Sequence, residues 1–284
     1  ALPISADAIE KAIGEMGGAA KSNLAAFRWG RAVVASPDVV TAAMTGEPPG
    51  PAEEREPSAR AQEAGGRLLR SATLPAATLV VVDWRLKDLV DYQGRVLAER
   101  YLETVQRVAD AEGKTAPGRT ELSEAVAHYL YKLLAYKDEY EVARLHLDPV
   151  FQRQIESEFP GASVRYKLHP PLLRAMGLKH KLALRPWVIT PTFRLLRSLR
   201  RLRGTALDPF GHAHVRRVER RLIEDYSSAV EAAAVGLTAG RYELAVELAT
   251  LPEIVRGYEE IKLRNVEEFD RRLKELRDEL KGTS

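Results

Sequence analysis

The strongest helical pattern in the chain runs from Leu122 to Asp148, where apolar side chains recur every three or four residues. Thr120 lies just past the breakers Pro117 and Gly118 and is a favourable N-cap residue for such a helix. The spacing predicts one long helix with a single apolar stripe, made of Leu122, Val126, Tyr129, Leu130, Leu133, Leu134, Tyr140 and Val142.

The second half of this helix is unusually polar for an element that contributes to a core. It holds Lys137, Asp138, Glu139, Glu141 and Arg144, and the pairs Lys137/Glu141 and Glu141/Arg144 have helical pairing distance. Two interpretations are open: a solvent face laced with salt bridges, or a polar seam packed against another domain. Periodicity alone does not distinguish them.

Helical periodicity also predicts the elements on both sides. Residues 78–92 and 93–112 form two amphipathic segments, either as separate helices or as one helix that tolerates Gly94. The turn at 114–118 then makes them antiparallel to the central helix. Further helices are predicted at 192–203, 218–237, 242–250 and 258–280. The predicted fold class is therefore mainly α, a multi-helix domain of long antiparallel helices.

Residues 163–190 are the least helical part of the chain. Val164, Tyr166 and Leu168 alternate with polar residues, and this period of two predicts a strand. A second strand is suggested by Leu182 and Leu184, with Trp187 and Ile189 as further members, and Pro186 would place it at an edge. We expect a small β hairpin or sheet near residues 163–190.

Composition divides the chain into three parts. Residues 1–45 read as three helical pieces, the first capped by Ser5 and the third by Ser36. Trp29 is predicted in the core, and a binding cluster of Arg28, Trp29 and Arg31 is the alternative. Residues 46–66 contain four prolines and four glycines and almost no bulky apolar side chain, so burial cannot repay their chain entropy. We therefore predict a Pro/Gly-rich linker over 46–72 and a C-terminal helical domain over 73–284.

The composition narrows the class of protein. The 284 residues include 45% hydrophobic and 29% charged residues and no cysteine, so this chain supplies no disulfide and no thiolate for zinc or an iron–sulfur cluster. No apolar run approaches the ~20 residues that a membrane span needs, and the first residues have no signal-peptide pattern. We expect a cytoplasmic protein. The start at Ala1, almost directly before a helix, suggests a segment of a longer chain.

Positive charge is concentrated between Ser163 and Arg221, where fifteen lysines and arginines face only Asp208 and Glu219. Three uses are open for this basic band: docking an acidic electron carrier, gripping coenzyme phosphates, or binding nucleic acid. The alternative is that its arginines pair with carboxylates of the C-terminal helices, such as Glu224, Asp225, Glu267 and Glu268. The docking candidates are Arg194, Arg197, Arg200, Arg201, Arg203, Arg216 and Arg217.

Four separated stretches carry a family resemblance, in the same order along the chain. They are NLAAFRWGR (23–31), KLLAYKDEYEVARL (132–145), LRGTALDPFG (202–211) and LPEIVRGY (251–258). Together they resemble the C-terminal region of the fused, indolepyruvate-type 2-oxoacid:ferredoxin oxidoreductases. Arg85, Tyr92, Gln93 and Tyr101 also match the family's pattern, whereas Lys167, His212 and Val215 depart from it.

The resemblance implies that residues 1–45 end a gamma-like domain and that the chain is a structural and interface segment. The full enzyme would decarboxylate arylpyruvates oxidatively to acyl-CoA and reduce ferredoxin, using thiamine diphosphate, Mg and 4Fe-4S clusters bound outside this chain. Expected partners are other domains or subunits of the enzyme, a second copy in a homo-oligomer, and ferredoxin. The interface candidates are Lys132, Tyr136, Lys137, Asp138, Tyr140 and Arg144.

The sequence contains no familiar catalytic signature, which agrees with a segment that has no catalytic site of its own. The sequence has no Gly-rich phosphate loop, HExxH motif or nucleophile elbow. His212 and His214, near Asp208, come closest to metal-ligand spacing but lack a third ligand, so we predict neither a catalytic nor a metal site. The competing function is a stand-alone helical adaptor or nucleic-acid-binding protein that uses the basic band, with nucleic acid the less favoured partner because no recognition helix or interleaved aromatic pattern accompanies the arginines.

Overall fold

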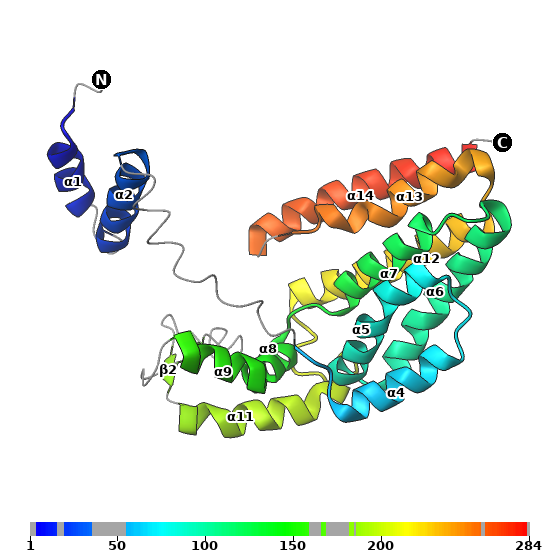
Figure 1. The fold of residues 1–284 in the computed structure, drawn as a ribbon, viewed down its shortest axis with the longest axis horizontal. Helices are drawn as coiled ribbons and strands as arrows, with labels where there is room; N and C mark the ends of the chain where they lie inside the picture. Colours follow the sequence, from blue (N-terminus) through cyan, green and yellow to red (C-terminus); the bar gives the residue numbers. More distant parts are fainter. Residues whose placement is uncertain are drawn as a thin grey trace. The chain divides into compact units, whose positions relative to one another are not determined.

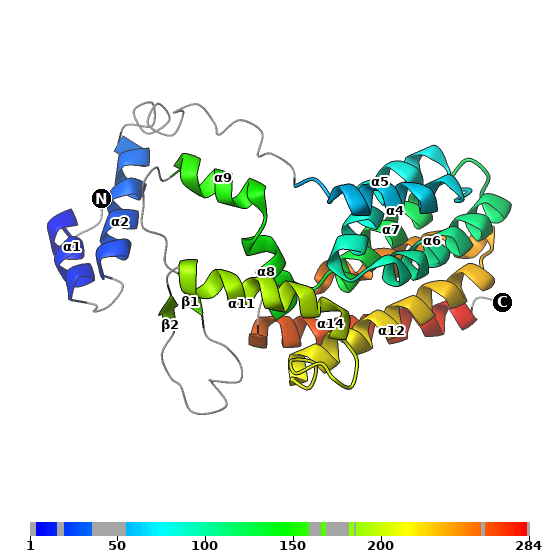
Figure 2. The same cartoon turned by 90° about the horizontal axis from the view of Figure 1, so that it is seen from below.

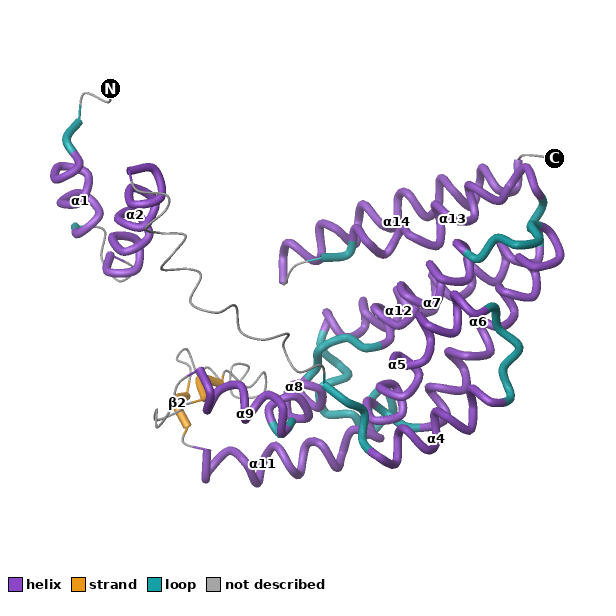
Figure 3. Tube along the Cα trace, in the orientation of Figure 1, coloured by secondary structure: helices purple, strands orange, loops and turns teal. Residues whose placement is uncertain are grey.

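The computed structural model describes residues 4–15, 20–35, 55–158, 166–168, 182–184, 186–256 and 259–282 (Figure 1). They belong to two compact units, Ala1–Glu54 and Arg55–Ser284, each of which is described by itself. Helices make up nearly all the regular structure of both (Figure 3), so the prediction of a mainly helical protein is confirmed.

The first unit contains α1 (Ala6–Gly14) and α2 (Ala20–Ala35). The Ser5 hydroxyl accepts the backbone N–H of Ala8 at 3.2 Å, as its N-cap position predicts, and Glu10 pairs with Arg28 on α2 at 2.7 Å. The prediction that Trp29 is a core residue is wrong, because its side chain is 52% exposed. The short third helix predicted after Ser36 lies outside the described residues.

The second unit is built mainly from a bundle of helices. In chain order they are α4 (Ala59–Arg70), α5 (Ala76–Tyr92), α6 (Arg95–Thr115), α7 (Glu121–Leu134), α8 (Glu139–His146), α9 (Pro149–Glu158), α11 (Pro186–Leu199), α12 (His214–Val235), α13 (Tyr242–Thr250) and α14 (Glu259–Gly282). There are also three short 3₁₀ helices. η1 (Arg200–Leu202) follows α11, η2 (Ala239–Arg241) precedes α13, and η3 (Leu251–Ile254) follows α13. None of the described helices combines the length and the apolar character that a membrane crossing requires.

One hydrophobic core joins α4 to α7 with α12 to α14, and Figures 1 and 2 show these helices packed along one another. α6 and α7 run antiparallel as predicted, because Glu112 near the end of α6 binds the start of α7 while Tyr101, early in α6, donates to Ala127 O. Buried members of the core include Val82, Leu86, Val105, Val126, Leu130, Leu222, Val230, Leu248, Phe269 and Leu276.

α4 corrects the predicted linker over 46–72, since residues 59–70 of that segment are helical. Ser58 caps the helix through a 3.2 Å hydrogen bond from Ala61 N, and its own N–H and hydroxyl donate to Asp91 on α5. Ala61 and Leu68 are buried in the shared core. The composition of the whole segment does not indicate this helix, because α4 has only three buried residues and two of them are small.

Gly94 separates α5 from α6, so residues 78–112 form two helices and not one. Its φ of 130° and ψ of 180° lie where side chains other than glycine are rarely accommodated. The turn allows the chain to reverse after Tyr92, whose ring and carbonyl both serve the site described below.

The single helix predicted from Leu122 to Asp148 is wrong: α7 ends at Leu134 and α8 begins at Glu139. Asp138 begins the second helix as an N-cap, because its carboxylate accepts the N–H of Glu141 at 2.8 Å. Thr120 precedes α7 but its side chain does not cap the helix; the Glu112 carboxylate accepts the N–H groups of Leu122 and Ser123 at 2.8 and 3.0 Å instead.

A second, smaller apolar cluster attaches α11 to α8. Ala143 on α8 packs with Ile189 and Phe193 of α11, and Leu147 and Leu196 complete the contact. Trp187 and Ile189 therefore belong to a helix, not to the second strand predicted for them. Pro186 begins that helix, a position where its missing N–H costs nothing.

Two three-residue strands, β1 (Tyr166–Leu168) and β2 (Leu182–Leu184), pair antiparallel with Tyr166 opposite Leu184. The residues between them lie outside the described ones. Beyond these two strands, the hairpin or sheet over 163–190 stays a prediction.

Two glycines in α4 provide a matched test of its packing against α5. A Cβ at Gly65 would lie 2.6 Å from Lys87 Cγ and 3.2 Å from Lys87 Cα, whereas one at Gly66 would meet only Arg70 Nη1 at 3.6 Å. We expect Gly65→Ala to lower the free energy of unfolding by about 1–3 kcal/mol through overpacking. Gly66→Ala should raise it by up to about 1 kcal/mol through helix propensity. Urea denaturation of both variants checks this, and a stabilised Gly65→Ala would show that α4 does not pack closely on α5.

Candidate functional site

The polar centre of the second unit is the buried side chain of Arg203, which is only 3% exposed. Its Nε and Nη2 donate to the two carboxylate oxygens of Asp138 at 2.5 and 2.8 Å, and its Nη1 donates to Tyr92 O at 2.9 Å. The guanidinium carbon also lies 3.6 Å from the centroid of the Tyr92 ring. This bidentate pair places a satisfied cation where a lone charge would be strongly unfavourable.

The loop at 202–211 folds around Asp208, and this fold orients Arg203 toward Asp138. The Asp208 carboxylate accepts Gly204 N at 2.8 Å, Phe210 N at 3.1 Å and the Tyr140 hydroxyl at 3.0 Å. Gly204 has a φ of 75°, and a Cβ on Gly211 would lie 2.7 Å from Asp208 Oδ2. The glycines and the aspartate of LRGTALDPFG are therefore required by the shape of this loop.

A second buried network lies beside the first. Arg144 donates to both oxygens of Glu141 at 2.7 Å and to Asp88 Oδ1 at 2.9 Å, and Asp88 also accepts the Tyr131 hydroxyl at 2.8 Å. Burial opposes the charge of Arg144, but its hydrogen bonds to Glu141 and the charge of Asp88 raise its pKa overall. Arg55 pairs with the same Asp88. We call Asp88, Tyr92, Asp138, Tyr140, Glu141, Arg144, Arg203 and Asp208 the ionic junction.

The interpretation of the polar half of the 122–148 segment as a salt-bridged solvent face is wrong. The charges of this half do not form a solvent face, because Asp138, Glu141 and Arg144 are at most 9% exposed and are directed into the unit. The predicted Glu141/Arg144 pair is present, while Lys137 is exposed.

Two further interface candidates lie at the edges of the junction. Lys132 donates to Pro252 O in η3 at 2.8 Å, which ties α7 to the turn after α13. Burial, followed by the charge of Asp138, raises the pKa of Tyr136 to about 12, and its carbonyl accepts the Tyr92 hydroxyl. Contact of the six candidates with another domain stays a prediction, with Lys137 the most exposed of them.

The seven basic docking candidates differ in exposure and pairing: two are held in ion pairs, one is half-buried and four are exposed. Arg203 is buried in the junction, and Arg216 pairs with Glu219 at 2.7 Å and with Glu139 at 3.4 Å. Arg200 is half-buried, and Arg194, Arg197, Arg201 and Arg217 are exposed. The alternative that basic-band arginines pair with carboxylates of the C-terminal helices holds for Arg221, which lies 3.8 Å from Asp225 and 2.6 Å from Asp270.

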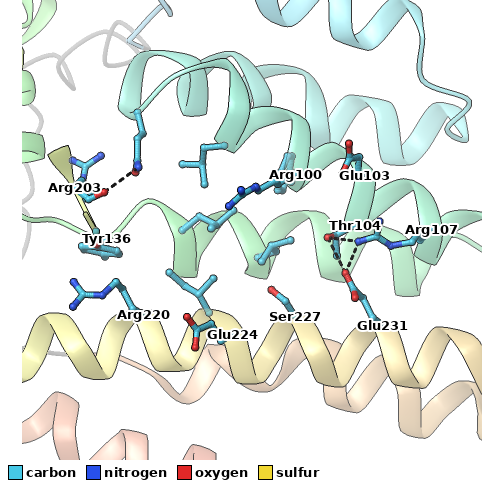
Figure 4. A pocket seen from close by; sticks show the side chains of 17 residues that line it. Arg100, Glu103, Thr104, Arg107, Tyr136, Arg203, Arg220, Glu224, Ser227 and Glu231 are labelled. Atoms are coloured by element: carbon cyan, nitrogen blue, oxygen red, sulfur yellow. Dashed lines mark hydrogen bonds and ion pairs between the residues drawn. The ribbon is translucent and has the colours of Figure 1, made fainter. Parts of the chain in front are cut away.

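A groove of about 410 Å³ lies beside the junction, between α6, α7 and α12 (Figure 4). Leu97, Leu130, Leu134 and Ile223 contribute apolar lining. Arg203, Tyr136 and Arg220 lie at one end, and Thr104, Arg107 and Glu231 hydrogen-bond with one another at the other. The lining residues include charges of both signs but no histidine or cysteine. The walls of this groove come from helices distant in the chain, so no local sequence pattern indicates it.

The two histidines nearest to metal-ligand spacing, His212 and His214, are exposed. The neighbouring Asp208 carboxylate is 3% exposed and occupied by its loop and by Tyr140. Among the described residues, no group of three His, Asp or Glu side chains is placed to hold a metal ion.

Comparison with known families gives one match. Residues 79–275 match the model of a family described as "Family of unknown function (DUF6537)", and this range contains the whole ionic junction. Comparison with curated proteins and with solved structures found no match.

Removing the cation of the ionic junction should be costly. Arg203→Met leaves the Asp138 carboxylate buried without its partner, so we expect a loss of about 3–5 kcal/mol in the free energy of unfolding. The control is Arg221→Met, whose side chain is 50% exposed and whose ion pairs should contribute about 1 kcal/mol or less. Urea denaturation followed by circular dichroism compares them. Equal losses would show that the junction does not stabilise the unit.

His146 should make the contact between α8 and α11 sensitive to acid. Its ring stacks on Phe193 with centroids 5.3 Å apart, and burial lowers its pKa below the ordinary value of 6.5. Since the unfolded chain then binds the proton more readily, stability should fall as the pH drops through about 6.5. His146→Phe should reduce this fall between pH 7.5 and 5, measured by urea midpoints. His212→Phe at an exposed position is the control, and an equal effect of both variants would contradict the assignment.

Proposed function

The chain belongs to the DUF6537 family, and we propose that it is the C-terminal structural and interface segment of an indolepyruvate-type 2-oxoacid:ferredoxin oxidoreductase. The observation that carries the proposal is the convergence of the stretches on which the resemblance rests. Three of the four lie in the second unit, and the stretch at 132–145 contacts the other two.

Each of these contacts joins residues far apart in the sequence. Asp138 of KLLAYKDEYEVARL binds Arg203 of LRGTALDPFG, and Tyr140 of the first stretch donates to Asp208 of the second. Lys132 reaches the carbonyl of Pro252 in LPEIVRGY. Three of the four matching stretches are therefore linked by contacts within the second unit, which supports a common fold more strongly than unconnected matches would.

The same contacts favour a structural role for the segment. The charged groups of the ionic junction bind one another, neighbouring side chains or the backbone. The activity of the full enzyme, oxidative decarboxylation of an arylpyruvate to an acyl-CoA with reduction of ferredoxin, would then belong to catalytic centres outside this chain.

The cofactors of such an enzyme would likewise be bound by other residues. The described part of this chain offers no group of three metal-ligating side chains for Mg, and its 284 residues include no cysteine to hold a 4Fe-4S cluster. This segment would instead support the domains that bind thiamine diphosphate and the clusters. We extend the proposal to a cytoplasmic enzyme that forms a homo-oligomer.

One observation favours the alternative function, a stand-alone adaptor or nucleic-acid-binding protein. Arg194, Arg197 and Arg201 are exposed on one short segment, and such a cluster would attract a phosphate backbone. Binding of duplex DNA or RNA that weakens steeply with salt would support this alternative.

The proposed function is tested first on the native protein from its source. We expect a polypeptide several times the 31.6 kDa of this chain, brown from iron–sulfur clusters, that oxidises indolepyruvate with coenzyme A and methyl viologen. The 284-residue chain alone should show no turnover. A colourless native protein of about 31.6 kDa, or turnover by the isolated chain, would contradict the proposal.

A further inference from the structure

The sequence contains a long segment without any negative side chain. Between Glu158 and Asp208 there is no aspartate or glutamate, while eleven lysines and arginines occur. Its longest described element is α11, which continues into η1. Compensation for these charges must come from other parts of the chain or from a partner.

Among the residues that the structure describes, one side of α11 is anchored in an apolar contact. Ile189 and Phe193, each 4% exposed, pack on Ala143 of α8. The side chains that point away from this contact remain open: Trp187 is 74% exposed and Leu195 is 60% exposed. Figure 2 shows α8 meeting α11. We define the α11 face as Trp187, Arg194, Arg197 and Arg201, which are all exposed and which the helical period of 100° per residue places on one side of the helix; the exposed Leu195 lies beside this face.

The charges of the α11 face are not balanced within the described structure. No carboxylate of the described residues forms an ion pair with Arg194, Arg197 or Arg201, whereas Arg203 and Arg216 nearby in sequence are both paired. The α11 C-terminus offers partial compensation, because Arg200 Nη1 donates to Arg197 O at 2.8 Å.

Arg200, in η1, also lies in an environment with an excess of positive charge. Its Nε is buried without a hydrogen-bond partner among the described residues. Burial, followed by the positive charges of Arg197 and Arg201, lowers its pKa. An anionic group placed beside these arginines would relieve their mutual repulsion.

We infer that the α11 face is the docking surface for a separate acidic protein that carries apolar side chains among its carboxylates. Carboxylates would pair with Arg194, Arg197 and Arg201, and apolar groups would cover Trp187. The expectation of an acidic partner follows from the residues of this surface and does not depend on the proposed function. The identity of the partner rests on the proposed function, in which it is the electron carrier ferredoxin.

A protein partner fits this face better than a nucleic acid. Arg194 and Arg201 are separated by about 10 Å along the helix, which is a compact patch and not a track for an extended phosphate backbone. Arginine and tryptophan are both enriched at protein interfaces. A small contact of this kind, with charge steering the approach, is typical of transient electron-transfer complexes.

The test measures binding of ferredoxin to the complete 284-residue chain by isothermal titration calorimetry at 20 mM and 300 mM NaCl. The reversal variant is Arg194→Glu, Arg197→Glu and Arg201→Glu. The matched control makes the same change in net charge at exposed positions of α14: Arg264→Glu, Lys274→Glu and Lys281→Glu. Circular dichroism verifies that both variants are folded. A third variant, Trp187→Ser, removes apolar contact and keeps the charge.

We expect the reversal variant to bind ferredoxin at least about tenfold more weakly at low salt and the control to bind like the wild type. The serine variant should bind more weakly but keep the salt dependence. Unchanged binding by the reversal variant, or equal losses in reversal and control variants, would overturn the inference. Binding of duplex DNA or of anionic phosphatidylserine vesicles through these arginines, without binding of ferredoxin, would also overturn it.

The docking inference and the proposed function can fail separately. Oxidation of indolepyruvate by the native protein with methyl viologen does not use the α11 face, so its absence would count against the proposed function alone. Turnover with methyl viologen together with ferredoxin reduction unaffected by the arginine reversal would count against the docking surface alone.

Discussion

The buried pair between Arg203 and Asp138 is the constraint on which the second unit depends. Each partner is 3% exposed, so neither charge is stable there without the other. Arg203 also donates to Tyr92 O at the end of α5, and Asp138 is the N-cap of α8. The pair therefore fixes where α5 ends, where α8 begins and how the 202–211 loop returns to the bundle. A buried pair often adds little net stability, but losing one partner leaves the other charge buried and unpaired, which disfavours any arrangement that separates them.

The position of α11 follows from the same pair. With Asp138 held by Arg203, α8 starts in a direction that places Arg144 against Asp88 and Ala143 against Ile189 and Phe193. α11 is thereby attached through α8 to the junction. The exposed arginines are thus presented by a helix whose base is a rigid polar network, and a rigid surface loses less conformational entropy when a partner binds.

Periodicity was sufficient to find most helices, because their apolar stripes are local features of the chain. It failed where an end is set by a distant residue. The break before Asp138 depends on Arg203, 65 positions away, and a carboxylate from α6, Glu112, replaces Thr120 as the cap of α7. α4 was missed because its buried face consists of Ala61, Gly65 and Leu68 within a segment rich in proline and glycine. In each case the missing information was a tertiary contact and not a local preference.

The basic band shows why charge alone could not locate the candidate site. Arg203 and Arg201 are two positions apart, yet one is buried in a bidentate pair and the other is exposed. Salt screens these two charges differently, since the Debye length of about 10 Å at 0.1 M applies to charges in solvent and much less to buried pairs. Ionic strength therefore separates the two roles of arginine in this chain: it should weaken attraction at the α11 face while leaving the ionic junction intact. The sequence contains both kinds of arginine in one band, and only burial distinguishes the cation that organises the fold from the cation that can meet a partner.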